Sequence, residues 1–67
     1  MDKEPILQFF SFDHLPDNLK IVSGKFCDLA YHVIAVLPRN PERTVALRKL
    51  LEAKDAAVRA AIYKDQA

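Results

Sequence analysis

The segment LPRNP, residues 37–41, constrains the fold of this chain more than any other stretch. Pro38 cannot continue a helix, Asn40 is a favoured helix N-cap, and Pro41 suits the first position of a new helix. A connection this short makes the second helix fold back antiparallel on the first. We therefore predict a helical hairpin, with helices at residues 16–37 and 41–64 joined by a turn at 38–40.

The first predicted helix has an apolar stripe. Pro16 and Asp17 suit a helix start. Apolar residues then recur at spacings of three and four: Leu19, Val22, Phe26, Leu29, Val33 and Val36. Gly24 lies within this helix at a cost of about 1 kcal/mol relative to alanine. Either that cost is tolerated, or a backbone or a ligand approaches Gly24 closely.

The second predicted helix has one broad apolar face. This face consists of Leu47, Leu50, Leu51, Val58, Ala61 and Ile62. Lys54 interrupts the apolar side of the helix. The simplest interpretation is a lysine whose stem packs on the apolar surface while its ammonium stays in water. A buried contact with a ligand is the alternative.

Residues 1–14 are predicted to form an arm rather than an element of their own, because this segment is short, starts polar and contains Pro5. If the arm is extended, Phe10 and Phe12 lie on the same side of it. The fold class is therefore all-α. A single domain spans residues 1–67, an antiparallel two-helix hairpin with a short N-terminal aromatic arm.

Two helices cannot cover all the apolar side chains of this chain. Ile21, Ile34 and Leu37 lie off the predicted stripe, and a chain of 67 residues buries only about 60% of the surface that its unfolded form exposes. We therefore expect the hairpins to assemble into a homo-oligomer.

Composition excludes several classes of protein. The only cysteine, Cys27, cannot form an internal disulfide, which favours a reducing cytoplasm. The N-terminal residues are acidic where a signal peptide is basic. No run reaches the roughly 18 apolar residues of a membrane span, so we expect no membrane partner. The net charge of +1 disfavours DNA or RNA polymers as partners.

The sequence offers little catalytic or metal-binding chemistry. Cys27 and His32 are five residues apart on a helix and so lie on different faces. Asp28 and His32 are four apart and can share a metal ion, but no third ligand follows at a recognisable spacing. We expect no catalytic residue, no metal site and no cofactor, and hence a protein that is not an enzyme.

Two features could bind a small anion. Arg39 and Arg43 flank the start of the second helix, where free backbone N–H groups and the helix dipole favour phosphate. Phenylalanines of the arm can stack on nucleobases. Both features also have ordinary structural interpretations, solvated arginines and aromatic side chains that cover the core. Isolated cations on a nearly neutral chain suit a small nucleotide better than a polymer.

Three stretches together resemble a known family. They are QFFSFDHLPDNL, VSGKFCDLAYHVIAVLP and NPERTVALRKLLEAKDAAVRAAI, and the resemblance spans about residues 8–62. In this combination the chain is similar to the small phage proteins of the anti-CBASS and anti-Thoeris sponge superfamily. The resemblance implies a compact homohexamer of helical hairpins. It also implies a protein of the host bacterial cytoplasm that sequesters cyclic di- and trinucleotide messengers of CBASS defence without cleaving them.

The resemblance also implies site residues. An arm aromatic stacks on a base of a cyclic dinucleotide and a helix lysine lies near its phosphates. The resemblance assigns stacking to Phe12, with Phe10 as the second candidate. It assigns the phosphate contact to Lys25, with Lys20 as the second candidate. The family commonly has tyrosine where this chain has phenylalanine, so the hydroxyl group is missing here. A separate cyclic trinucleotide site is implied at four residues of the turn and second helix: Arg43, Thr44, Arg39 and Asn40.

Two other functions remain open from the sequence. One is a small helical phage accessory protein that docks on a host protein and has no nucleotide site. The other is a DNA-binding regulator, which would need a third helix and a denser basic face. The sequence is compatible with more than one cyclic nucleotide ligand. A signal of the cyclic ADP-ribose type is one of the alternatives.

Overall fold

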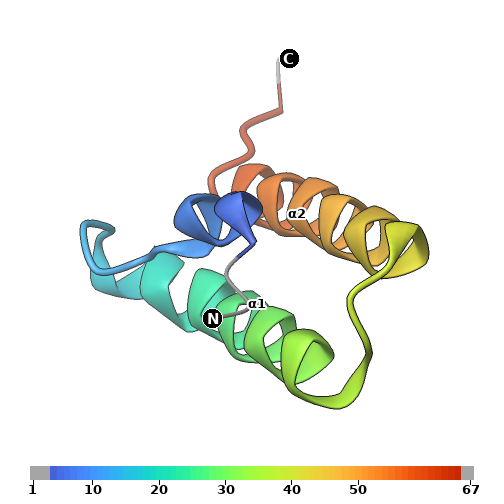
Figure 1. Ribbon diagram of the computed structural model, residues 1–67. Coiled ribbons are helices and arrows are strands. Elements are labelled where there is room, and N and C mark those ends of the chain that lie inside the picture. Colours follow the sequence, from blue (N-terminus) through green and yellow to red (C-terminus); the bar gives the residue numbers. More distant parts are fainter. Residues whose placement is uncertain (1–3, 66–67) are drawn as a thin grey trace.

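The structure, a computed structural model, describes residues 4–65 (Figure 1). Its elements are a 3-10 helix, η1 (Pro5–Phe10), and two α-helices, α1 (Asp17–Val36) and α2 (Pro41–Ala61). No strand occurs within this range, so the predicted all-α class is confirmed. The helix predicted at 16–37 is shorter by one residue at each end, and the helix predicted at 41–64 ends three residues earlier.

The connection between α1 and α2 follows the local rules of helix capping. Leu37 leaves the helical region with ψ of 141°, as expected of a residue before proline. The Asn40 side chain accepts a hydrogen bond from the backbone N–H of Arg43 at 2.9 Å, and Pro41 occupies the first turn of α2. The chain therefore reverses within a few residues, and α2 packs against α1.

The N-terminal segment differs from the predicted arm. Residues 5–10 form a 3-10 helix, in which the Gln8 amide donates to the carbonyl oxygen of Pro5 at 3.0 Å. Figure 1 shows η1 beside both long helices, and it contacts α1 and α2 alike. An extended arm with Phe10 and Phe12 on one side is therefore wrong. Phe10 is fully buried, whereas Phe12 lies beyond η1 and is half-buried.

The core is small. Its buried apolar side chains are Phe10, Ala30, Leu47 and Leu51, and seven partly buried residues pack around them: Ile6, Leu7, Phe26, Cys27, Val33, Ile34 and Leu50. The predicted stripe of the first helix is rotated, because Ala30 faces the core while Leu29 and Val36 are exposed. A small side chain at position 30 lets the helices approach closely. The predicted face of the second helix holds at Leu47 and Leu51 but not at Ile62, which is exposed.

Several large apolar side chains remain exposed on the single chain. They are Phe9, Ile21, Leu29, Tyr31, Val36, Leu37, Val45, Ile62 and Tyr63. Scattered exposed apolar residues are normal in a monomer, but nine among the 62 described residues is a large share for so small a core. This surface is what a further copy or another protein would cover.

Candidate functional site

Arg43, predicted to contact phosphate, is buried at the start of α2. Only 2% of the residue is exposed. Its Nη2 and Nε donate to Oε1 of Glu4 at 2.8 and 3.2 Å. Its Nη1 donates to the carbonyl oxygens of Leu37 at 3.1 Å and Ile34 at 3.4 Å. Each nitrogen of the guanidinium thus has an acceptor within the protein, and Arg43 ties the N-terminal segment to the end of α1.

The other residues assigned to the cyclic trinucleotide site lie around Arg43 but on the surface. Arg39, Asn40 and Thr44 are exposed. The Asn40 side chain caps α2, and the Thr44 hydroxyl donates to the Asn40 carbonyl at 3.4 Å. The structure therefore brings these four residues together at the connection. In this conformation the guanidinium of Arg43 faces Glu4. Arg39 and Thr44 are the exposed side chains at the connection that we assign to ligand contact.

The residues assigned to the cyclic dinucleotide site separate by burial. Phe10 is enclosed in the core, so no base can reach its ring in this conformation. Phe12 lies against α1, where a Cβ added to Gly24 would be 3.5 Å from the Phe12 ring. Lys25 is exposed and Lys20 is half-buried. Phe12 therefore packs against Gly24, the residue before Lys25, and an aromatic ring is what approaches Gly24.

Two cavities flank the N-terminal segment. The larger, about 790 Å³, lies between this segment and α1, and its walls include Leu7, Phe12, Cys27, Tyr31 and Ile34. The charged residues that line it, Glu4 and Asp13, are both acidic. This cavity therefore suits an apolar or aromatic group better than a phosphate.

Cys27 lines the larger cavity and is the only thiol of the chain. Partial burial raises the pKa of the Cys27 thiol above its ordinary value, and the carboxylates of Asp28 and Asp13 raise it further. The thiol therefore stays protonated at neutral pH and is a weak nucleophile.

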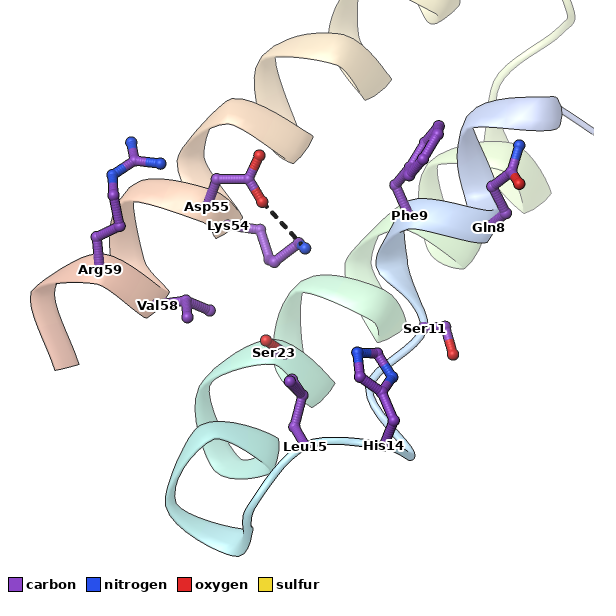
Figure 2. Close-up of a pocket in the computed structure, with 10 residues that line it drawn as sticks. All are labelled: Gln8, Phe9, Ser11, His14, Leu15, Ser23, Lys54, Asp55, Val58 and Arg59. Atoms are coloured by element: carbon purple, nitrogen blue, oxygen red, sulfur yellow. Dashed lines mark ion pairs between the residues drawn. The ribbon is translucent and has the colours of Figure 1, made fainter. Parts of the chain in front are cut away.

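The smaller cavity, about 390 Å³, lies between the N-terminal segment, the first half of α1 and the second half of α2 (Figure 2). Its walls bring together Phe9, His14, Ser23, Lys54 and Arg59. None of these five is among the site residues that the resemblance implies, although a buried contact with a ligand is the alternative interpretation of Lys54 in the sequence. Figure 2 shows Lys54 paired with Asp55, and the Nζ to Oδ1 distance is 3.1 Å.

A sequence signal for Ser23 and Lys54 does exist. Ser23 precedes the buried Ala30 by seven residues, and Lys54 follows the buried Leu47 by seven, so each shares its helix face with a core residue. In an antiparallel pair, Ser23 and Lys54 therefore come to the same end of the interface. A polar side chain on the core-facing side of each helix is thus the sequence feature that indicates this cavity.

No family model, no curated protein and no solved structure matches this chain. The resemblance to the sponge superfamily thus stays a prediction. Among residues 4–65, no helix is both long and apolar enough to cross a membrane. Within the same range, no three His, Cys, Asp or Glu side chains gather as a metal site would require.

Proposed function

We propose that this protein is a phage sponge that binds cyclic di- and trinucleotide messengers of CBASS defence in the host bacterial cytoplasm and keeps them from their effector. The observation that carries the proposal is the position of the aromatic segment. Residues 8–12, QFFSF, open the stretch that resembles the superfamily. Gln8 and Ser11 of this segment line both cavities, Phe9 lines one and Phe12 the other.

Sequestration needs only binding. A base can stack on an aromatic ring of the N-terminal segment while cationic groups hold the phosphates, and such stacking is worth about 1 to 3 kcal/mol per base. In the proposed dinucleotide site, Phe12 supplies the ring and Lys25, next to Gly24, supplies the charge. Phe10 is excluded from this role as long as it stays in the core, which leaves Phe12 as the stacking residue there.

The proposed trinucleotide site is at the connection, where Arg39 and Thr44 are exposed beside the start of α2. Arg43 serves this site by fixing the connection as well as by its charge. A direct contact between Arg43 and a phosphate requires the ligand to displace the Glu4 carboxylate. Ligand binding at this site is therefore coupled to release of the N-terminal segment.

Assembly is part of the proposal. The exposed apolar residues of α1, among them Ile21, Leu29 and Val36, would be covered in a homohexamer. Sedimentation equilibrium at micromolar concentration should then give six times the chain mass of 7.6 kDa. A folded monomer under these conditions contradicts the hexamer.

The experiment that tests the proposed function is a panel of cyclic di- and trinucleotides against the purified protein, read by thermal shift and calorimetry. Linear dinucleotides are the controls, and cyclic ADP-ribose isomers complete the panel. A ligand at about 100 times its dissociation constant adds roughly 2.7 kcal/mol to stability. We expect selective stabilisation, and recovery of intact ligand after heat denaturation would show that binding occurs without cleavage.

The alternative is a helical accessory protein that docks on a host protein. The specific observation that favours it is the exposure of Ile21, Tyr31, Val36 and Leu37 on and after α1. A flat response to the whole ligand panel, together with a monomeric chain, supports docking over sequestration.

A further inference from the structure

The smaller cavity contains a buried hydroxyl group without a protein partner. Ser23 of α1 is 1% exposed, and its Oγ makes no hydrogen bond to any residue that the structure describes. A buried hydroxyl left unpaired costs free energy, and such groups are rare in folded proteins unless something else satisfies them. Ser23 lines the cavity, so a bound molecule can supply the missing partner.

A cation lies across the cavity from Ser23. The Lys54 side chain is only 14% exposed, although lysine is rarely buried. Figure 2 shows Ser23 on α1 and Lys54 on α2 facing the same space. An ammonium group has three N–H donors. The half-exposed Asp55 carboxylate forms an ion pair with this ammonium group at 3.1 Å. A single carboxylate does not occupy three donors, so the ammonium group can also donate to a ligand.

The charges of the two cavities differ in sign. Lys54, Arg59 and Asp55 are the charged residues that line the smaller cavity, so cations outnumber carboxylates. The charged residues of the larger cavity, Glu4 and Asp13, are both acidic. Of these two cavities, the lining of the smaller one is therefore the better match for an anion. Because Lys54 and Ser23 both donate hydrogen bonds, the matching group is one with several acceptor oxygens, such as phosphate.

An aromatic ring completes the site. Phe9 lines the same cavity and is 56% exposed, whereas the adjacent Phe10 is fully buried. An exposed ring beside a phosphate-sized anion site can stack on a nucleobase. The cavity volume of about 390 Å³ is within the range of small-molecule sites, about 300 to 1,000 Å³.

We propose that this cavity binds a phosphate group of a nucleotide, with Lys54 and Ser23 donating to its oxygens and Phe9 stacking on the adjacent base. The site differs from those assigned through Phe12 and Lys25 or through Arg43. The nucleotide nature of the ligand rests on the proposed function, whereas the position of the site rests on the buried Ser23 and Lys54.

Calorimetry on the full chain with cyclic GMP-AMP, and separately with inorganic phosphate, tests this site. Lys54→Met keeps the apolar stem and removes the charge, and we expect it to weaken cyclic GMP-AMP binding by about tenfold or more. Ser23→Ala should weaken binding by about three- to tenfold. Lys49→Met is the matched control, because Lys49 is on the same helix but 71% exposed, and it should bind as wild type does.

The role of Phe9 has its own test. Phe9→Ala should weaken cyclic GMP-AMP binding by about fivefold or more and leave inorganic phosphate binding unchanged, because only the base uses the ring. Tyr63→Ala, which removes another exposed aromatic ring, should change neither. Equal losses for both ligands in Phe9→Ala would overturn the stacking role.

The outcomes separate this site from the proposed function. If wild type, Lys54→Met and Ser23→Ala bind cyclic GMP-AMP equally, the site is overturned and the proposed function stands. If no cyclic nucleotide binds, but phosphate shifts the amide NMR signals of Ser23 and Lys54 in wild type and not in Lys54→Met, these residues are supported as phosphate donors. The nucleotide ligand and the proposed function are then overturned. Failure of wild type to bind either ligand overturns both.

Discussion

Each end of the helical hairpin shields a cation of α2 from water, Arg43 fully and Lys54 partly, and the surroundings of the two cations differ. At the connection, Arg43 meets the Glu4 carboxylate and two backbone carbonyls, so each guanidinium nitrogen has an acceptor. At the opposite end, Lys54 forms an ion pair with its neighbour Asp55, and the nearby Ser23 hydroxyl has no hydrogen-bond partner among residues 4–65. Removing one member of a buried ion pair destabilises a fold strongly, because the other charge is left without compensation. Arg43 is therefore expected to have a structural role. Lys54 is partly buried and lies beside a buried hydroxyl without a partner among the described residues, and this is where we expect a ligand.

The largest expected effect is at the connection. Arg43→Ala leaves the Glu4 carboxylate without its partner and two carbonyls without their donor. Loss of one member of a buried pair costs about 3 to 5 kcal/mol. We expect the lower end of this range, because Glu4 can reach water if the N-terminal segment detaches. Urea unfolding at one fixed protein concentration measures the loss.

Arg39→Ala is the matched control for Arg43, since Arg39 is exposed beside the same turn, and it should change stability by less than about 0.5 kcal/mol. If Arg43→Ala is too unstable to purify, Glu4→Gln provides a milder break of about 1 to 2 kcal/mol, because the amide oxygen still accepts a hydrogen bond. If Arg43→Ala is as stable as wild type but loses cyclic trinucleotide binding, Arg43 contacts the ligand and does not stabilise the fold. The proposed difference between the two ends of the hairpin would then be wrong.

A smaller effect of opposite sign is expected at Gly24. An added Cβ would meet the Phe12 ring at 3.5 Å, an ordinary van der Waals distance, and the backbone of Gly24 does not have positive φ. Gly24→Ala should therefore raise the free energy of unfolding by up to about 1 kcal/mol through helix propensity. Thermal denaturation measures the gain. A loss of stability would show that the Phe12 ring is packed too tightly to accept a methyl group.

The smallest stability effect is expected at Ser23. Ser23→Ala removes a hydroxyl that has no partner and replaces serine with a better helix former, so the ligand-free protein should gain about 0.5 kcal/mol. Ser11→Ala, an exposed serine of the same cavity, should have no effect on stability. If Ser23→Ala instead lowers the free energy of unfolding by about 1 kcal/mol or more, the Ser23 hydroxyl has a hydrogen-bond partner in the ligand-free protein. The proposed difference between the Arg43 end and the Lys54 end of the hairpin would then be wrong.

The local parts of this fold could be predicted from the sequence. Asn40 and Pro41 act within a few residues of themselves, so capping rules place the start of α2 correctly. The rotation of α1 could not be predicted in the same way. Apolar residues lie on more than one side of this helix, and the choice of Ala30 over Leu29 for the core depends on how closely α2 approaches.

The docking of the N-terminal segment could not be predicted either. Glu4 and Arg43 are 39 positions apart, and no local pattern links them. The sequence predicts anion binding at Arg43 because a helix start with an arginine favours anions in general. The anion that the structure places there is the protein's own carboxylate. The approach of Ser23 to Lys54 could not be predicted for a related reason. The sequence marks Lys54 as an interruption of an apolar face, with a buried ligand contact as the alternative interpretation, but Ser23 looks ordinary on its own helix. That the two residues line one cavity depends on the antiparallel pairing.

The ion pair between Glu4 and Arg43 also sets an order of events during synthesis. Glu4 and Phe10 are synthesised before α2, which supplies their partners Arg43, Leu47 and Leu51. Contacts between residues so distant in sequence form late and slow the search for the native state. The nascent chain therefore exposes its phenylalanine-rich segment until α2 is available to cover it, and in this interval the exposed apolar surface favours aggregation.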